Sequence, residues 1–440
     1  MKVAIIGTGY VGLVTGTCLA EVGNNVVCID NDKNKVKNMQ RSMLPIYEPQ
    51  LEEIFKRNIE IGRLKFTESI EDGVYDTSII FLALPTPSLD NKSTDLSHIF
   101  QVAEQLGPLL KKYTVIINKS TVPVGTTEQI RSRIANTTDQ EFDVISNPEF
   151  LREGFAVSDF MFPDRVVIGT DSRKARSLLV KLYEPFLGRD TPVIYMGEKS
   201  AEMTKYAANT FLATKLSFIN EIANLCELTG ADIDSVRLGM ATDARIGNRY
   251  LSSGIGYGGG CLPKDARSFK STSEEHGYNF KILDSAISVN DMQKKKLISD
   301  VISYYGNVSG KKIALWGLSF KPDTDDVREA ASLDIIRGLI KNGALITAYD
   351  PVANVNAEKE LGKLKALNFV NDAYEALEGA NALIIATEWA EFRRPEFTRM
   401  KQLLQEPVIF DGRNLYDVND MRKLGFYYKS IGRETVIVKV

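Results

Sequence analysis

The feature that most constrains the fold is a glycine motif near the start of the chain, between a predicted strand and a predicted helix. The β-branched run at residues 3–6 predicts a short strand, and Gly7-Thr8-Gly9-Tyr10-Val11-Gly12 follows it directly. A helical pattern continues from there and ends at Gly23. In this setting the three glycines are typical of the turn that opens a doubly wound α/β domain and approaches a phosphate group.

An acidic residue completes the motif at the end of the second predicted strand. Residues 25–29 form an apolar run that stops at Asp30, 18 residues beyond Gly12, where a dinucleotide site needs an acid for the ribose hydroxyls. A carboxylate accepts hydrogen bonds from a free 2′-hydroxyl and repels a 2′-phosphate, which favours NAD over NADP, although Lys33 and Lys35 lie nearby. The pyrophosphate is expected at the positive end of the helix that begins near Tyr10. The predicted cofactor residues are Gly7, Gly9, Tyr10, Val11, Gly12 and Asp30.

Two further apolar runs predict more strands of the same sheet. Residues 77–84 end in Pro85-Thr86-Pro87, and residues 114–119 end in Ser120-Thr121. Nearly continuous apolar runs are typical of a parallel sheet that is covered on both faces. Ligands of such sheets bind beyond the carboxyl ends of the strands, where these polar residues fall. Simple turn chemistry is the alternative interpretation of the same residues.

A long helix is predicted in the middle of the chain. Residues 200–229 contain no proline or glycine, and Gly230 follows, so a helix of about 30 residues and ~45 Å is expected. Such a rod can join two domains. Lys205 and Asn209 are four residues apart and therefore project from one face of this helix. They are either functional groups or ordinary solvated polar residues.

The last third of the chain repeats the pattern of the first. Residues 306–310 are rich in Gly, Asn and Ser, and a strand pattern then ends at Gly317, a second at Asp350 and a third at Thr387. The residues after Gly317 do not include the second and third glycines of the motif at residues 7–12. This unit should therefore not hold a dinucleotide in the same way. The predicted fold is α/β, with two doubly wound Rossmann-like domains joined by the long helix. The expected divisions are 1–199, 200–305 with dimerisation and a cysteine loop, and 306–440.

Cys261 lies in a loop that contains five glycines, within Gly254-Ile255-Gly256-Tyr257-Gly258-Gly259-Gly260-Cys261. Glycines allow the backbone to come close to a bulky ligand and to adopt dihedrals that a β-carbon forbids. A thiol beside a hydride acceptor suggests oxidation through a covalent intermediate, whereas the alternative is a flexible loop with an incidental buried cysteine. Cys18, Cys28 and Cys226 show no metal-type spacing, so reduced thiols are expected.

Composition excludes several classes of function. The chain has 440 residues, of which 44% are hydrophobic and 25% charged, and its formal net charge of −3 gives no basic excess for binding nucleic acid. Only two histidines, His98 and His276, are present, which leaves little material for a Ser-His-Asp triad or a His-rich metal site, and no metal is expected. The first strand begins at once and no ~20-residue apolar span follows, so a cytoplasmic protein without a membrane partner is expected.

Taken together, the motifs resemble the UDP-glucose 6-dehydrogenase branch of the UDP-glucose/GDP-mannose dehydrogenase family along nearly the whole chain. Eight motifs in the same order are very specific. The segments that carry the resemblance are residues 7–12, 120–125, 147–154 (Asn-Pro-Glu-Phe-Leu-Arg-Glu-Gly), 163–165 (Pro-Asp-Arg), the helix with Lys205 and Asn209, 258–265, 320–324 (Phe-Lys-Pro-Asp-Thr) and 411–413 (Asp-Gly-Arg).

The resemblance implies oxidation of the C6 alcohol of UDP-glucose to a carboxylate, with two NAD+ consumed in succession. Cys261 would form a thiohemiacetal and then a thioester, and Lys205 and Asn209 would stabilise the oxyanion. Asp265, one turn beyond Cys261 if a helix begins there, would position or deprotonate water. The resemblance also assigns catalytic or relay roles to Thr121, Glu149 and Glu153.

The resemblance further implies two sets of binding residues and a homodimer. Arg328 would reach NAD from the C-terminal domain, so that closure of the two halves assembles the site. Arg245 would reach the substrate of a neighbouring subunit. Additional cofactor contacts are implied for Lys35, Pro85, Thr86, Thr121, Glu153, Lys264 and Arg328. Contacts with the UDP-sugar are implied for Phe150, Leu151, Arg152, Lys205, Asn209, Arg245, Tyr250, Gly258, Lys321 and Arg413.

Three alternative functions remain open at this point. A sibling enzyme would oxidise a UDP-N-acetylhexosamine or GDP-mannose by the same mechanism, although Arg245-Ile246-Gly247 is closer to the glucose branch. A 3-hydroxyacid or 6-phosphogluconate type of dehydrogenase would transfer one hydride, and Cys261 argues against it because one oxidation needs no thiol. A non-enzymatic NAD-sensing module with decayed catalysis is the third, and intact Lys205, Asn209, Cys261 and Asp265 argue against it.

Overall fold

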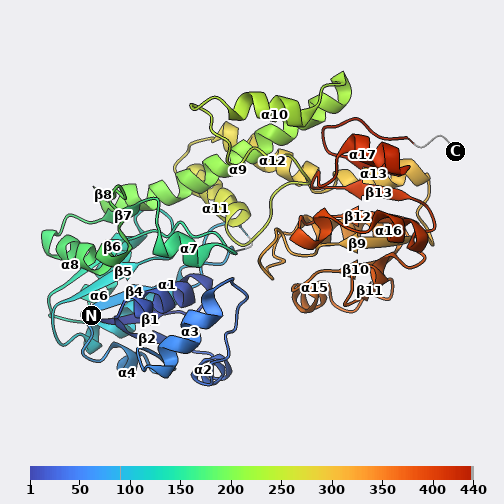
Figure 1. Ribbon diagram of the computed structural model, residues 1–440. Coiled ribbons are helices and arrows are strands. Elements are labelled where there is room, and N and C mark those ends of the chain that lie inside the picture. The colour runs from blue at the N-terminus through green and yellow to red at the C-terminus, as the bar shows by residue number, and fades with distance from the viewer. Residues whose placement is uncertain (90, 438–440) are drawn as a thin grey trace. The chain divides into compact units, whose positions relative to one another are not determined.

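The computed structural model describes residues 1–89 and 91–437, and the chain forms two compact units, Met1–Ala208 and Asn209–Val440 (Figure 1). Each unit is built on a sheet with helices on both faces; the sheet of the second unit is parallel, and that of the first is parallel except at one pair of strands. Among the residues that the structure describes, none of the helices combines the length and the hydrophobicity that spanning a membrane requires.

The first unit contains an eight-stranded sheet in the order β3-β2-β1-β4-β5-β6-β7-β8. Neighbouring strands are parallel except β6 and β7, which are antiparallel. The order of the first six strands is that of a doubly wound dinucleotide fold, whose binding crevice lies where the order reverses, between β1 and β4. The strands are β1 (Lys2–Ile6), β2 (Asn25–Ile29), β3 (Leu64–Thr67), β4 (Ile79–Leu82), β5 (Thr114–Asn118), β6 (Phe142–Ser146), β7 (Val166–Gly169) and β8 (Val193–Met196).

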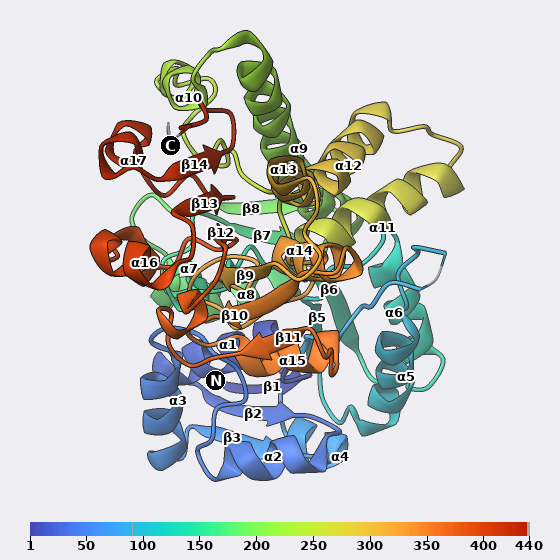
Figure 2. The same cartoon turned by 90° about the vertical axis from the view of Figure 1, so that its right-hand side faces the viewer.

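Alternate residues of these strands supply two apolar cores, one for each face of the sheet. Val3 and Ile5 of β1 pack with α1, α3, α7 and α8, whereas Ala4 and Ile6 pack on the opposite face with α5 and α6, which lie side by side (Figure 2). This alternation follows from the two-residue period of a strand. The helices are α1 (Tyr10–Glu21), α2 (Lys33–Gln40), α3 (Leu51–Glu60), α4 (Ile70–Val74), α5 (Ser97–Leu106), α6 (Thr126–Ala135), α7 (Ala156–Met161) and α8 (Arg173–Tyr183).

The predicted long helix is present as α9 (Glu198–Thr229), which has 32 residues and continues from the first unit into the second. Gly230, with a φ of +78°, follows its last residue, as the sequence predicts. The N-terminal part of α9 is anchored within the first unit, because Glu202 accepts hydrogen bonds from the backbone N–H groups of Gly125 and Thr127.

The second unit contains a six-stranded parallel sheet in the order β11-β10-β9-β12-β13-β14, the same order as the first six strands of the other sheet. One face packs with α9, α10, α13 and α14, and the other with α16 and α17. Its strands are β9 (Lys312–Trp316), β10 (Leu345–Tyr349), β11 (Leu367–Phe369), β12 (Ala382–Ile385), β13 (Val408–Asp411) and β14 (Tyr427–Ser430). Its helices are α10 (Ile233–Ala241), α11 (Leu262–Glu275), α12 (Lys281–Gln293), α13 (Lys296–Tyr305), α14 (Ala331–Lys341), α15 (Asn354–Leu361), α16 (Phe397–Leu403) and α17 (Val418–Leu424).

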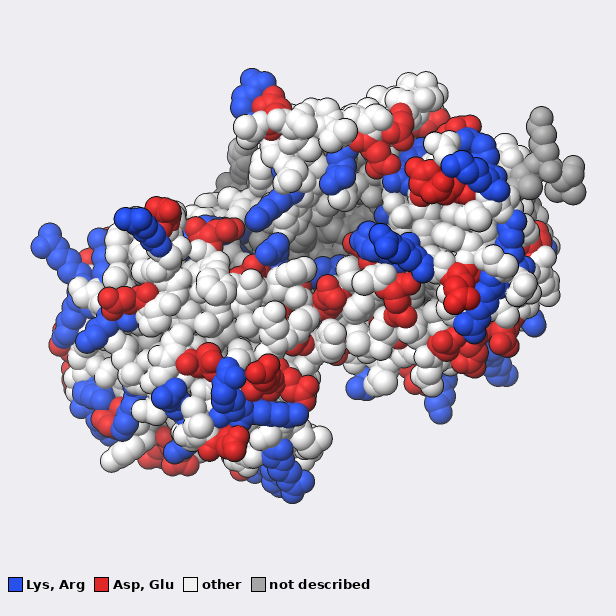
Figure 3. Space-filling view, viewed as in Figure 1, with Lys and Arg blue, Asp and Glu red and all other residues white. Residues whose placement is uncertain are grey.

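These findings confirm the predicted fold class of two doubly wound domains and a long central helix. The predicted strands at 77–84 and 114–119 are shorter in the structure, because β4 ends at Leu82 and β5 at Asn118. On the face shown in Figure 3, basic and acidic side chains are interspersed over each unit, in line with the small net charge.

Candidate active site

The glycine turn between β1 and α1 has the geometry that a bound pyrophosphate needs. A Cβ at Gly7, whose φ is +98°, would lie 2.3 Å from the carbonyl oxygen of Ala83, and a Cβ at Gly12 would lie 1.9 Å from that of Gly7. Packing within the chain therefore explains these two glycines. A Cβ at Gly9, the N-cap of α1, would meet no protein atom within 4 Å. A side chain there would fill the space beside the helix N-terminus in which a phosphate binds, so the turn fits the group.

Asp30 lies at the end of β2 beside this turn. Its Oδ2 accepts hydrogen bonds from the backbone N–H of Thr8 at 3.1 Å and from the Thr8 hydroxyl, and it forms a 3.1 Å ion pair with Lys35. Burial alone would raise the pKa of Asp30, but these contacts and the N–H of Asp32 hold it below its usual value. The ionised carboxylate retains acceptor capacity for ribose hydroxyls. The structure thus brings Lys35 to Asp30, as the prediction of both as cofactor residues requires.

The loops that follow β4 and β5 also meet beside the glycine turn. The Thr86 hydroxyl donates to the carbonyl oxygen of Thr121 at 3.1 Å, and the Ser120 hydroxyl donates to that of Leu84 at 2.8 Å. Ala83 contacts Gly7 in the same region, as the glycine geometry shows. Pro85, Thr86 and Thr121 are therefore grouped at the carboxyl ends of the central strands, where the sequence predicts them.

A buried ion pair lies within the first unit. Nζ of Lys205 on α9 is 2.9 Å from Oε1 of Glu149, and both side chains are only 5% exposed. Glu149 Oε2 accepts a hydrogen bond from the N–H of Leu151. Burial alone would raise the pKa of Glu149, but Lys205 and the Leu151 N–H hold it below its usual value. The predicted catalytic residues Lys205 and Glu149 therefore form one charged unit near the beginning of the segment 147–154.

Lys119 is a functional candidate that the sequence did not single out. It is buried at the end of β5, where its Nζ lies 3.2 Å from Oδ1 of Asn147 and from the hydroxyl of Tyr183. Burial and the charge of Lys205 lower its pKa to about 8, although Glu149 acts in the opposite direction. A lysine at the end of a strand with a continuous apolar run, Val115-Ile116-Ile117, was the available signal.

The segment 150–153 carries the predicted substrate and relay residues. Two cations lie near the Phe150 ring, with Lys205 Nζ 5.4 Å and the Arg165 guanidinium 3.6 Å from its centroid. Leu151 is partly buried against the core of the first unit. The Arg152 guanidinium is held by Asp159 at 2.6 Å, and Glu153 is buried.

Cys261 occupies the N-cap of α11 in the second unit, and it is exposed, whereas Cys18, Cys28 and Cys226 are buried. Burial raises the pKa of the Cys18 and Cys28 thiols, so they are poor nucleophiles. A helix N-terminus stabilises the thiolate form of a cysteine. Cys261 is thus accessible, and its exposure contradicts the alternative of an incidental buried cysteine.

Asp265 lies one turn along α11 and is held by three contacts. Its backbone N–H donates to the carbonyl oxygen of Cys261 at 2.9 Å, its Oδ2 accepts from Nδ2 of Asn209 at 2.6 Å, and its Oδ1 is 3.1 Å from Nζ of Lys264. The Asp265 side chain is only 1% exposed. Asn209 lies on α9 one turn beyond Lys205. The predicted residues Asn209, Lys264, Asp265 and Cys261 are therefore brought together.

The glycines before Cys261 are explained by packing within the second unit. A Cβ at Gly258 would lie 2.4 Å from the carbonyl oxygen of Glu329, and one at Gly260 would lie 2.3 Å from Cζ of Arg328. The N–H of Gly259, whose φ is +86°, donates to the carbonyl oxygen of Arg328 at 2.8 Å. Contacts with Arg328 and Glu329 therefore account for these glycines without a bulky ligand. The same packing places the Arg328 guanidinium beside the residue that precedes Cys261.

Arg413 crosses from the end of β13 to the glycine loop. Its Nη1 donates to the carbonyl oxygen of Gly256 at 3.2 Å and its Nη2 to that of Phe320 at 3.3 Å. Lys321 follows Phe320, and its Nζ lies 5.6 Å from the centre of the Phe320 ring. Gly258 packs against Phe320 as well. The structure therefore groups Gly258, Lys321 and Arg413 at the carboxyl end of the second sheet.

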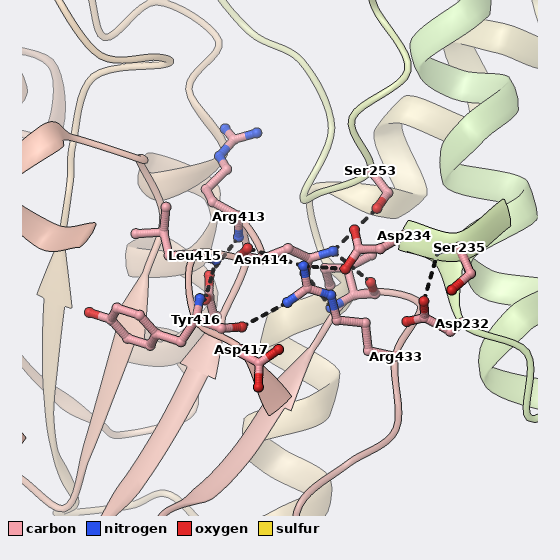
Figure 4. Close-up of polar contacts among 12 residues, drawn as sticks. Asp232, Asp234, Ser235, Ser253, Arg413, Asn414, Leu415, Tyr416, Asp417 and Arg433 are labelled. Atoms are coloured by element: carbon pink, nitrogen blue, oxygen red, sulfur yellow. Dashed lines mark hydrogen bonds and ion pairs between the residues drawn. The ribbon is translucent and has the colours of Figure 1, made fainter. Parts of the chain in front are cut away.

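A second arginine, Arg433, holds the turn at residues 413–416 that contains Arg413. Arg433 donates to the carbonyl oxygens of Asn414 and Tyr416 and pairs with Asp234 of α10, while the Arg413 side chain points away from this cluster (Figure 4). Asn414 has a φ of +56° and donates to the carbonyl oxygen of Ile431 at 2.9 Å. The turn is thereby held in a conformation that few residues other than glycine and asparagine adopt.

Arg245 and Tyr250 lie in the segment between α10 and α11. Arg245 is 89% exposed and pairs with Asp243, two residues before it. Tyr250 is partly exposed and has a φ of +61°, which is a strained backbone conformation for an aromatic residue. A single chain thus does not bring Arg245 into the Arg413 group.

Comparison with known proteins identifies the family. Three domain models of the UDP-glucose/GDP-mannose dehydrogenase family match the chain: the NAD binding domain at residues 1–187, the central domain at 199–292 and the UDP binding domain at 314–418. The UDP-glucose 6-dehydrogenase of Pseudomonas aeruginosa is 45% identical over 443 residues, which cover 98% of both chains.

Solved structures agree with this assignment. A UDP-glucose dehydrogenase from Pyrobaculum islandicum superposes with a TM-score of 0.91 at 34% identity, covering 98% of both chains. A UDP-D-ManNAc dehydrogenase from Pyrococcus horikoshii gives a TM-score of 0.85 at 26% identity, covering 98% of this chain and 99% of that one. The chain therefore belongs to the UDP-glucose/GDP-mannose dehydrogenase family and is an NAD-dependent dehydrogenase.

Proposed function

We propose that the protein oxidises UDP-glucose to UDP-glucuronate in two successive steps and consumes two NAD+ per substrate molecule. The observation that carries the proposal is the exposed Cys261 at the start of α11, with Asp265 one turn along and held by Asn209. A single oxidation to a carbonyl needs no nucleophilic thiol. The names of the relatives, at up to 45% identity, support UDP-glucose as the substrate.

The cofactor would be held by the glycine turn with Tyr10 and Val11, by Asp30 and Lys35, and by the loops that carry Pro85, Thr86 and Thr121. Glu153, Lys264 and Arg328 complete this proposed set. NAD+, when bound, supplies the acceptor for a hydride in each oxidation. Asp30 selects it over NADP+ because an ionised carboxylate repels a 2′-phosphate.

In the first step the C6 alcohol loses a hydride and its hydroxyl proton and becomes an aldehyde. The proton leaves through water held by Thr121 and Glu149. The Cys261 thiolate then adds to the aldehyde carbon to form a thiohemiacetal, and its oxyanion is stabilised by Lys205 and Asn209. No free aldehyde is released.

In the second step the thiohemiacetal carbon loses a hydride and becomes a thioester. Water, positioned and deprotonated by Asp265, attacks the thioester carbon, and the C–S bond breaks to release the carboxylate and regenerate the Cys261 thiol. The buried environment of Asp265 and its bond from Asn209 fix the carboxylate in one orientation.

The UDP-sugar would be bound by basic residues of the second unit and by the segment after Glu149. Lys321 and Arg413 provide the positive charge that a pyrophosphate requires. Phe150, Leu151, Arg152, Tyr250 and Gly258 would line the rest of the site. The division into an NAD domain, 1–199, a middle segment, 200–305, and a UDP-sugar domain, 306–440, belongs to this proposal.

A homodimer is also proposed, in which Arg245 of one subunit reaches the substrate of the other. Support comes from exposed apolar residues on α9: Phe211, Phe218 and Leu225 are seven residues apart and share one face, and Leu228 is 85% exposed. A stripe of this kind on a long helix is typical of a helix–helix interface. A second copy of the chain would present the same stripe.

A cytoplasmic location is proposed because all four cysteines are free thiols, which is typical of a reducing compartment.

The alternative substrates are a UDP-N-acetylhexosamine and GDP-mannose. The test is a panel of UDP-glucose, UDP-N-acetylglucosamine, UDP-N-acetylmannosamine and GDP-mannose, with NADH followed by absorbance and products identified by mass spectrometry. UDP-glucose should give the highest kcat/KM and two NADH per UDP-glucuronate. A higher kcat/KM for another sugar would overturn the substrate assignment.

A further inference from the structure

Glu48 is a buried carboxylate that connects the cofactor turn to the segment carrying the proposed sugar-binding residues. It lies between α2 and α3 and is only 4% exposed. Its Oε2 accepts hydrogen bonds from the hydroxyl of Tyr10 and, at 2.6 Å, from the N–H of Gly154. Its Oε1 accepts from the N–H of Ala156 at 2.7 Å. One side chain therefore binds two segments that are more than 100 residues apart in the sequence.

The partners of Glu48 lie in the cofactor turn and in the segment that follows Glu149. Tyr10 is the first residue of α1, within the glycine motif, and its hydroxyl also accepts a hydrogen bond from the N–H of Gly154 at 3.0 Å. Gly154, with a φ of +79°, ends the segment that begins with Glu149, and Ala156 is the first residue of α7. Glu149 in turn pairs with Lys205. The contacts of Tyr10 and Glu48 thus connect the cofactor turn to the Gly154 end of this segment, and the ion pair with Lys205 holds its other end.

We propose that Glu48 is a positioning residue through which an occupied cofactor turn orders the segment 149–156 for the sugar substrate. The importance of this segment for the sugar rests on the proposed function. The physical reason is that the carboxylate fixes the N–H groups of Gly154 and Ala156. The N–H of Ala156, the first residue of α7, would otherwise be an orphan donor at the start of the helix. The Tyr10 hydroxyl ties this anchor to α1, whose N-terminus would bind the pyrophosphate.

Two substitutions distinguish the role of Glu48 in holding Gly154 and Ala156 from the role of Tyr10 in connecting Glu48 to α1. Glu48→Gln keeps the size of the side chain but replaces one acceptor oxygen with an amide donor, so one of the three donors loses its partner. Tyr10→Phe leaves in place the hydrogen bonds that the N–H groups of Gly154 and Ala156 donate to Glu48. It removes the two contacts of the Tyr10 hydroxyl, with Glu48 and with the N–H of Gly154, which are the link to α1. Glu52→Gln, at an exposed position that pairs with Lys56, is the matched control.

The test is hydrogen exchange of peptides that span residues 151–157, measured with and without NADH and with no sugar present. In the wild type and in Glu52→Gln, NADH should slow exchange of these amides by roughly 5- to 100-fold, the range of ordinary coupling energies. Tyr10→Phe should lose most of this slowing while its exchange without NADH stays near that of the wild type. Glu48→Gln should exchange faster even without NADH. Because no substrate is used, the result is independent of the proposed function.

Kinetics provides the second readout. At saturating NAD+, Glu48→Gln should lower kcat/KM for UDP-glucose by roughly tenfold or more, while KM for NAD+ changes by less than about threefold. Equal slowing by NADH in the wild type and in Tyr10→Phe would overturn the proposal, as would the absence of slowing in the wild type. If Glu48→Gln fails to fold, Tyr10→Phe alone decides the outcome. Failure of the wild type to oxidise UDP-glucose would instead overturn the proposed function and leave the exchange result standing.

Discussion

Asn209 donates a 2.6 Å hydrogen bond from Nδ2 to Oδ2 of Asp265, and the N–H of Asp265 donates to the carbonyl oxygen of Cys261. The long helix α9 and helix α11, whose N-cap is Cys261, are thus joined by a buried contact. Because Lys205 lies one turn before Asn209 on α9, the rotation of this helix determines where both side chains project. The contact therefore holds the Asp265 carboxylate and the Asn209 amide together, one helical turn along α11 from Cys261.

Asn209→Ala should impair catalysis more than binding. The substitution leaves Asp265 buried without its amide donor and removes a proposed oxyanion contact, so kcat should fall by roughly 10²–10³-fold. Asn224→Ala, which removes a contact to Gln293 from the same helix, is the control and should keep kcat within about threefold. Steady-state kinetics with UDP-glucose and NAD+ measures both. A normal kcat for Asn209→Ala would contradict the assigned role.

Asp30→Ala should weaken the preference for NAD+. The wild type should use NAD+ with a kcat/KM more than about 100-fold above that for NADP+, since the carboxylate repels the 2′-phosphate. Removing the carboxylate also frees Lys35 from its ion pair with Asp30. The ratio of kcat/KM for NAD+ to kcat/KM for NADP+ should therefore fall by roughly tenfold or more. Glu68→Ala, a change at a nearby acid that pairs with Lys33, should leave the ratio unaltered. Equal use of both cofactors by the wild type would refute the role of Asp30.

The pH dependence of stability should report on Lys119. Its pKa in the folded state is about 8, below the ordinary value of 10.5, because the charged form is buried. The folded state therefore binds fewer protons than the unfolded state between these two pH values, and the stability of the wild type should rise with pH across this window. Below pH 8 the full penalty of burying the charge applies.

Lys119→Met removes this titration and provides the comparison. The wild type should gain up to about 3 kcal/mol relative to the variant between pH 7.5 and pH 10, as converted from the size of the pKa shift. Thermal unfolding of both proteins across this range, with Lys112→Met as an exposed control, measures the difference. If the difference in unfolding free energy between the wild type and Lys119→Met does not change with pH, the pKa of Lys119 is not lowered by burial.

Phe218→Asp should disrupt the proposed dimer. Phe218 lies in the middle of the exposed stripe on α9, where a charge would oppose association. Val355→Asp on α15, an equally exposed apolar position in another part of the second unit, should not affect it. Light scattering coupled to size exclusion should give a monomer mass for Phe218→Asp and a dimer mass for the control and the wild type. A wild-type monomer would overturn the dimer.

The sequence was sufficient for those features that depend on local pattern. The glycine turn at Gly7, the acid at Asp30 and the long helix that carries Lys205 follow from spacing and periodicity, and the structure places them as predicted. Features that depend on contacts distant in sequence could not be predicted. Glu48 pairs with Gly154, 106 residues away, and nothing in its neighbouring residues indicates that partner.

The glycines before Cys261 illustrate the same limit. Their composition indicates a constrained backbone, but it cannot distinguish a ligand from a protein neighbour as the cause. The structure shows that Phe320, Arg328 and Glu329 occupy the positions where Cβ atoms would lie. Lys119 was likewise hidden, since a lysine at the end of a strand is usually solvated and only the fold reveals its burial.

The most direct test of the central claim is the turnover of UDP-glucose to UDP-glucuronate by Cys261→Ser. A serine hydroxyl without an adjacent base is a weak nucleophile, so completion of the second oxidation should fall by more than about 10³-fold, and a covalent sugar adduct should be visible as added mass on the intact protein. Cys226→Ala, a change at a buried cysteine of the same unit, should remain active. Near-normal production of UDP-glucuronate by Cys261→Ser would show that Cys261 is structural and would contradict the covalent mechanism.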